Sequence, residues 1–111
     1  MQKHHARPSA NFSLFIGLIL TLPVCAQEIS ATRQHELMNL LKQDCGSCHG
    51  LTLQGGLGPA LTVQALSDKP KEAMVATIMN GRPGTPMPPW RNQLTEAETR
   101  WLVDNLYQGI N

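Results

Sequence analysis

Three residues near the middle of the chain have the types and the spacing of a covalent cofactor site: Cys45, Cys48 and His49. Two thiols three positions apart at the end of a helix point to the same side, at a separation that suits thioether bonds to the two vinyl groups of a haem. The histidine that follows is carried beneath the iron, where its imidazole is expected to be the proximal ligand. The motif therefore predicts one covalently bound haem c, with its iron, per chain.

Two other kinds of site use the same cysteine spacing. A dithiol oxidoreductase of the thioredoxin type places the pair after a β-strand and at the start of a helix, whereas here a helix precedes the pair. A zinc site needs a second pair of Cys or His ligands, and after residue 26 the only other histidine is His35. We interpret His35 as a solvated or partly buried helix residue. Haem attachment is the interpretation that the motif favours.

The distal iron ligand is sought among four methionines: Met38, Met74, Met79 and Met87. The first three lie in predicted helices, where methionine usually fills the core. Met87 lies in a proline-rich loop that cannot be helical, and a stiff loop holds a thioether near the iron with little loss of entropy. Met87 is the predicted ligand, Met79 is the second choice, and an open site is the remaining alternative. A closed His/Met site indicates electron transfer rather than catalysis, so we expect no catalytic residues.

Three polar or aromatic side chains flank the methionine loop: Arg82, Trp90 and Arg91. Their N–H groups are suited to hydrogen bonds with the haem propionates. The alternative is that the arginines are solvated and that the tryptophan serves only in packing.

The elements that must position these residues are three predicted helices, over about 30–44, 68–80 and 95–108. Apolar residues recur in each at helical spacing, and Thr95 with Glu98 forms a capping box at the start of the last. We expect Pro70 in the first turn of the second helix. The segments between the helices are rich in Gly and Pro and are predicted to be loops, and no segment alternates as a strand. The chain is therefore expected to be all-α.

The first 26 residues are predicted to be a signal peptide. Basic residues precede an apolar run over 12–24, which is too short to span a bilayer, and a cleavage site follows at Val24-Cys25-Ala26. The alternatives are a retained membrane anchor and lipidation of Cys25. The domain at 27–111 carries seven basic and eight acidic residues, a net charge of −1, which does not suggest nucleic-acid binding. We expect an exported monomer that has no membrane contact once the signal is removed.

The whole of 27–111 resembles the class I c-type cytochromes: helix, Cys-x-x-Cys-His, Gly/Pro loop, helix, methionine loop and terminal helix. The resemblance implies three to four helices wrapped around one haem, and terminal helices that cross with Trp101 against the first. It also implies that the Pro59 carbonyl accepts a hydrogen bond from the His49 ring, which fixes the ring orientation. We expect four leucines to line the porphyrin: Leu53, Leu57, Leu61 and Leu66.

A closer resemblance covers shorter strings, at 44–52, 56–61, 76–78 and 81–85. In these strings the chain is similar to the NirC, or cytochrome c-55X, family of denitrifying bacteria. That resemblance implies a periplasmic electron donor to the haem c/haem d1 nitrite reductase. The alternative that it implies is a factor in the final maturation of haem d1, and a haem-free dithiol oxidoreductase is the third hypothesis.

Overall fold

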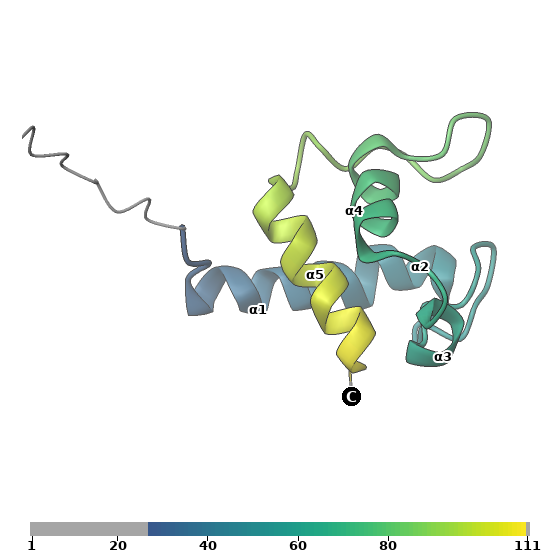
Figure 1. Cartoon of the computed structure of the whole chain (residues 1–111), viewed down its shortest axis with the longest axis horizontal. Helices are drawn as coiled ribbons and strands as arrows, with labels where there is room; N and C mark the ends of the chain where they lie inside the picture. The colour runs from purple at the N-terminus through teal and green to yellow at the C-terminus, as the bar shows by residue number, and fades with distance from the viewer. Residues whose placement is uncertain (1–26, 111) are drawn as a thin grey trace, which may run out of the picture.

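The computed structural model describes residues 27–110, and this part of the chain is helical with no strand (Figure 1). The predicted signal peptide and Cys25 lie outside the described residues. Within 27–110 no helix is both long and apolar enough to cross a membrane. The elements follow in the order α1 (Ala31–Leu40), η1 (Leu41–Cys45), α2 (Gly46–His49), α3 (Val63–Leu66), α4 (Lys71–Asn80) and α5 (Glu96–Gln108). The expected all-α fold is confirmed.

The first helix runs directly into the cysteine motif. It begins at Ala31, where the Ser30 hydroxyl accepts a hydrogen bond from the Arg33 N–H at 3.2 Å. We expected the helix to end at Asp44, but it continues through the π-helical turn η1 and through α2 as far as His49. It ends at Gly50, whose φ of 89° suits glycine and allows the chain to turn sharply. Nothing in 41–49 breaks a helix strongly enough to end it earlier.

The remaining helices differ from expectation mainly at their starts. The short α3 lies in a segment predicted to be loop, and it is capped by the Thr62 hydroxyl, which accepts from the Ala65 N–H at 3.2 Å. Four residues are too few for a helical period to appear in the sequence. Helix α4 begins at Lys71, so Pro70 flanks it rather than lying in its first turn.

The predicted capping box at the start of α5 is confirmed. The Thr95 hydroxyl accepts from the Glu98 N–H at 3.2 Å, and the Glu98 carboxylate accepts from the Thr95 N–H at 2.8 Å. The other oxygen of Glu98 accepts from the Arg33 guanidinium at 2.6 Å, which ties α5 to α1. One carboxylate therefore both starts the last helix and fixes it against the first.

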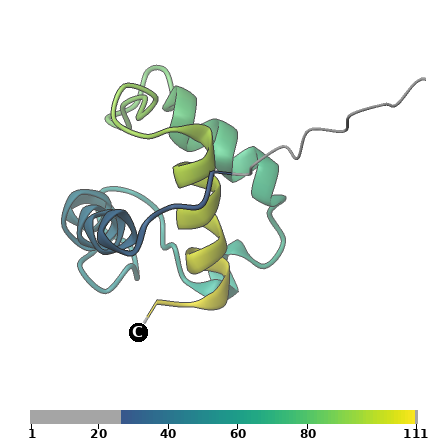
Figure 2. The same ribbon diagram turned by 90° about the vertical axis from the view of Figure 1, so that its left-hand side faces the viewer.

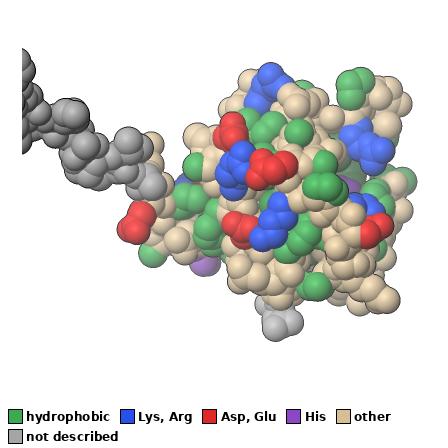
Figure 3. Space-filling model, in the orientation of Figure 1, with side chains coloured by type: hydrophobic (Ala, Val, Ile, Leu, Met, Phe, Trp, Pro, Cys, Tyr) green, Lys and Arg blue, Asp and Glu red, His purple; other side chains and the backbone are tan. Residues whose placement is uncertain are grey.

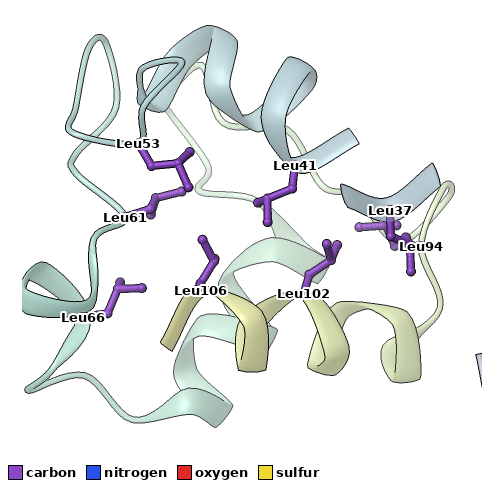
Figure 4. Packing of buried hydrophobic residues seen from close by; sticks show 8 residues of the cluster. All are labelled: Leu37, Leu41, Leu53, Leu61, Leu66, Leu94, Leu102 and Leu106. Carbon is purple, nitrogen blue, oxygen red and sulfur yellow. The ribbon is translucent and has the colours of Figure 1, made fainter. Parts of the chain in front are cut away.

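The core consists of leucines where α5 crosses α1. Figures 1 and 2 show the two helices crossing steeply, with α4 beside α5. Trp101 is partly buried against this core. Eight side chains form the cluster (Figure 4): Leu37, Leu41, Leu53, Leu61, Leu66, Leu94, Leu102 and Leu106. The core thus holds the terminal helices together and leaves the far ends of η1, α2 and α4 to form another surface.

Ion pairs link α4 to α5 on the outside of this core. Lys71 pairs with Asp104 at 2.5 Å, and Arg100 bridges Glu72 on α4 and Glu96 on its own helix. Figure 3 shows basic and acidic side chains interleaved on the face over α5. The pairs are half-exposed, so each adds little stability alone but helps to fix the register of α4 on α5.

Replacing Glu98 with glutamine is expected to flatten the acid dependence of stability. The hydrogen bond from Arg33, with a further one from the Thr95 N–H, holds the pKa of Glu98 below its ordinary value of 4.5, although partial burial opposes this. The carboxylate therefore contributes stability that is complete above that ordinary pKa and is lost as pH falls through the lowered one. Urea unfolding of the holoprotein between about pH 6 and pH 3 measures the difference.

Glu98→Gln is expected to be less stable than the natural protein at neutral pH, because glutamine keeps the capping acceptor but lacks the charge that pairs with Arg33. In acid, the stabilities of the two proteins are expected to converge. Glu36→Gln is the matched control, since Glu36 also pairs with Arg33 but caps nothing. A stability difference for Glu98→Gln that is the same at every pH would contradict this account.

Candidate functional site

A cavity of about 280 Å³ opens between the end of the first helix and α4. One wall comes from η1 and α2 and carries Cys45, Cys48 and His49. The opposite wall comes from α4 and the 81–90 loop and carries Met87. Most of the lining is apolar. The structure therefore brings two thiols, an imidazole and a thioether to one largely apolar space.

The two cysteines are not joined to each other, and both are partly buried. Burial, with a smaller effect from the Asp44 carboxylate, raises the pKa of the Cys45 thiol to about 11. Dithiol oxidoreductases need an attacking thiolate and obtain it at the N-terminus of a helix. Here the pair lies in the last turns of a helix, so the geometry disfavours the oxidoreductase alternative. Within 27–110 no three His, Cys, Asp or Glu side chains are grouped to hold a metal ion together.

The imidazole of His49 is held by the loop that follows it. Its Nδ1 lies 2.7 Å from the Pro59 carbonyl oxygen, the contact that the resemblance implied. A carbonyl only accepts, so Nδ1 carries the proton and Nε2 keeps its lone pair for a metal. The loop returns to the motif through two backbone hydrogen bonds, from Gly55 N–H to the His49 carbonyl and from Gly58 N–H to the Cys48 carbonyl, both at 2.8 Å.

Gly58 leaves the space that the ring occupies. A Cβ atom at this position would lie 2.7 Å from His49 Cε1 and 2.8 Å from Nδ1, closer than real Cβ contacts allow. The glycine is therefore needed for close approach of the loop to the imidazole rather than for an unusual backbone angle. Gly46, between the cysteines, is different: a Cβ there would make ordinary contacts with Leu51.

Of the four methionines, Met87 and Met74 line the cavity. The second choice of ligand, Met79, was wrong. Its sulfur lies 3.1 Å from the hydroxyl of the buried Thr99 on α5, on a different face of α4 from Met74. Met38 packs against the leucine core. Among residues 27–110 Met87 is the only methionine on a loop, and Met74 replaces Met79 as the alternative ligand.

The flanking donors separate into two groups. Arg82 and Trp90 line the cavity, but Arg91 does not. The Arg91 Nε donates to the Met79 carbonyl at 3.2 Å, so its guanidinium satisfies the C-terminal end of α4. Arg91 is therefore a helix-capping residue in this structure, and a propionate contact from it is not supported.

The structure places the four leucines expected around the porphyrin in two different environments. Leu57 and Leu61 line the cavity, and Leu61 belongs to the core as well, whereas Leu53 and Leu66 lie in the core and do not reach the cavity. Sequence reasoning missed the contribution of α4, which faces the cavity with Met74, Thr77 and Ile78. The sequence predicts that Met74 fills the core because it lies in a helix, and it predicts no role at the haem site for Thr77 or Ile78. A cavity and a core demand the same apolar pattern, so the spacing alone does not distinguish them.

The residues present fit a covalently attached haem. The thiols would supply thioether links, the free Nε2 of His49 and the Met87 sulfur would supply ligands for iron, and the apolar walls match the macrocycle. A helical fold closed around such a motif defines the class of c-type cytochromes, electron-transfer proteins that carry covalently bound haem c. The chain is accordingly an electron-transfer protein.

Comparison with known proteins identifies the family. The family model for cytochrome C oxidase, cbb3-type, subunit III matches residues 32–106. Cytochrome c55X from Pseudomonas aeruginosa is 55% identical over 108 residues, covering 93% of this chain and 91% of that protein. A solved structure of a c-type cytochrome NirC is 60% identical with a TM-score of 0.71, covering 72% of this chain and 94% of that one. The chain belongs to the cytochrome c55X family, as the resemblance of its motifs predicted.

A third relative is much longer. The dihydro-heme d1 dehydrogenase of Pseudomonas aeruginosa is 43% identical over 71 residues, which cover 63% of this chain but only 14% of that protein. The similarity therefore concerns one domain-sized part of the dehydrogenase.

Gly58→Ala is expected to disturb the site from the loop side. The added methyl group must displace the His49 ring or the loop, which costs about 1–3 kcal/mol of stability. It also weakens the hydrogen bond to Pro59, so the imidazole becomes a poorer donor to iron and the reduction potential of the holoprotein rises. Potentiometric titration and urea unfolding measure the two effects.

Gly46→Ala is the matched control, because its methyl group meets only ordinary contacts in a helix. It is expected to leave the potential unchanged and the stability equal or slightly higher. Equal potentials for the natural protein and Gly58→Ala would show that the ring is not set by this loop.

Proposed function

We propose that this chain is a periplasmic one-electron carrier of denitrification that donates electrons to nitrite reductase. One haem c is attached through Cys45 and Cys48, with His49 and Met87 as the iron ligands. Removal of residues 1–26 as a signal peptide accounts for the location, and the remaining domain acts as a monomer. The single observation that carries the proposal is the convergence of all four of these side chains on one apolar cavity.

The chain's own residues have distinct tasks in this proposal. The haem supplies a reversible one-electron couple. Cys45 and Cys48 fix its position, and the bond from His49 to Pro59 fixes the orientation of the proximal ring. Met87 closes the distal side and raises the potential. The apolar walls exclude water and substrate, and Arg82 and Trp90 provide N–H donors for the propionates.

Nitrite reductase is proposed as the partner because the family resemblance implies it. Charge gives little further guidance. Four of the seven basic residues of 27–110 are committed to ion pairs: Arg33, Lys69, Lys71 and Arg100. Electron-transfer contacts are small and transient, so the binding is expected to be weak and its salt dependence modest.

A second candidate function is a role in haem d1 maturation. The observation in its favour is the similarity of this chain to a part of dihydro-heme d1 dehydrogenase. A domain of this kind inside a dehydrogenase has the chemistry to take up the electrons that the oxidation releases, and a separate domain of the same kind has that capacity too. In this role the cytochrome accepts electrons instead of donating them to nitrite reductase.

Met87→Ala is expected to open the distal side while the haem stays attached. The oxidised holoprotein then loses the weak long-wavelength absorption of iron–methionine bonding. Its potential falls by an amount on the order of 0.1 V, within the span of about 0.8 V that axial ligands set. Visible spectroscopy and potentiometry make the measurement. Met74→Leu is the matched control, because Met74 lines the same cavity from α4; loss of the absorption in Met74→Leu alone would move the assignment to Met74.

Mixing the reduced holoprotein with purified nitrite reductase and nitrite tests the partner. Rapid oxidation that depends on nitrite is expected, followed by stopped-flow absorbance of the haem. The oxidised holoprotein mixed with dihydro-heme d1 dehydrogenase and its substrate tests the second function. Slow oxidation in the first experiment with fast reduction in the second would favour maturation. No transfer in either would refute both partners and leave the cytochrome assignment standing.

A further inference from the structure

The loop that carries Met87 has few hydrogen-bond donors of its own. Residues 81–90 include the four prolines Pro83, Pro86, Pro88 and Pro89, which lack an N–H group. The Arg82 N–H donates to the Met87 carbonyl at 3.1 Å, and the Trp90 N–H donates to the Ile78 carbonyl on α4 at 3.0 Å. These two bonds close the base of the loop and anchor its end, but neither uses the Met87 N–H.

The Thr85 hydroxyl serves the Met87 N–H. It accepts a hydrogen bond from that amide at 3.3 Å and donates its own proton to the Arg82 carbonyl at 2.6 Å. The Thr85 N–H donates to the same carbonyl at 3.1 Å. The two bonds of the Thr85 hydroxyl are the hydrogen bonds that side chains of 81–89 make in the structure. Both backbone polar groups of Met87 are therefore fixed, one by Arg82 and the other by a threonine side chain.

The base of the loop is also too tight to rearrange easily. Gly81 has a φ of 67°, and a Cβ atom there would lie 2.6 Å from the Pro88 carbonyl carbon and 2.8 Å from the Met87 carbonyl oxygen. The backbone from the Met87 carbonyl to Pro89 is thus pressed against the start of the loop. On the other side of Met87, the backbone N–H is restrained by the hydrogen bond to the Thr85 hydroxyl.

We infer that Thr85 is the positioning residue of the distal ligand: its hydroxyl locks the Met87 backbone and so keeps the thioether directed into the cavity. The inference rests on the proposed role of Met87. Thr85 lines the cavity, but its proton is donated to Arg82 and its oxygen accepts from Met87, so the hydroxyl acts through Met87 and not on the haem. Loss of the hydroxyl is expected to let Met87 leave the iron more often.

Imidazole binding to the oxidised holoprotein tests this inference, because added imidazole takes the distal position only when Met87 leaves it. Thr85→Val keeps the shape and removes both hydrogen bonds, while Thr85→Ser keeps the hydroxyl and removes only the methyl group. We expect imidazole to bind Thr85→Val about threefold to tenfold more tightly than the natural protein, which is the effect of losing the hydrogen bond to the Met87 N–H on a two-state equilibrium. Thr85→Ser is expected to stay within about twofold.

Three results would overturn the inference. Equal imidazole affinity in Thr85→Val and the natural protein would mean that the hydroxyl does not restrain Met87. Equal tightening in Thr85→Ser and Thr85→Val would assign the effect to the methyl group. A shifted potential with unchanged imidazole affinity would mean that the hydroxyl acts on the haem directly.

Met87→Ala is measured in the same titration to separate this inference from the ligand assignment. If Met87→Ala binds imidazole strongly while Thr85→Val resembles the natural protein, only the inference about Thr85 fails. If Met87→Ala binds imidazole no better than the natural protein, Met87 is not the ligand and both fail. Urea unfolding of each holoprotein shows whether a change in affinity follows from general loss of stability, which a purely structural role of Thr85 would produce.

Discussion

The continuity of the helix from Ala31 to His49 is the constraint on which the rest of this structure depends. Its first half is held against α5 by leucines and by the ion pair from Arg33 to Glu98. Its second half carries the two cysteines and the histidine. Because one rigid element serves both purposes, the packing of the terminal helices determines where the motif lies. The Gly/Pro loop then closes on the motif by backbone hydrogen bonds and orients the imidazole.

The two walls of the cavity are built by different means. The wall that carries His49 is a helix end with a loop folded back on it. The loop packs closely against the motif because glycines in both segments leave room for the close approach. The distal wall is α4 and a loop whose prolines remove most conformational freedom. Arg91 and the Trp90 N–H join that loop to the last carbonyls of α4. The apolar face of α4 and the methionine loop therefore form one unit, which is fixed in turn to α5 by ion pairs.

Much of this arrangement follows from the sequence because its signals are local. The cysteine motif, the capping box at Thr95 and the proline-rich loop each occupy a few neighbouring residues. The structure confirms the capping box, leaves the proline-rich segment outside any helix and places the motif at the end of a helix. The errors concern which side chains point to the cavity and which point to the core. Met79 and Met74 both lie on α4, and only the packing of α4 on α5 determines that Met79 turns toward Thr99 while Met74 turns toward the cavity. Leu53 and Leu66 were misplaced for the same reason, since which loop leucines reach the core depends on contacts distant in sequence.

The π-helical turn at Leu41–Cys45 bears on how the length of the first helix can vary. A π turn holds one residue more than an α turn but makes a similar rotation, so it takes up an extra residue without turning one end of the helix relative to the other. Deleting one residue from this turn would restore α geometry and leave Leu37 in the core while the cysteines still face the cavity. Deleting one residue from the α-helical stretch between Leu37 and Leu41 would instead rotate everything before it by about 100° relative to the motif. The same loss of one residue is therefore tolerable in the π turn and disruptive just before it.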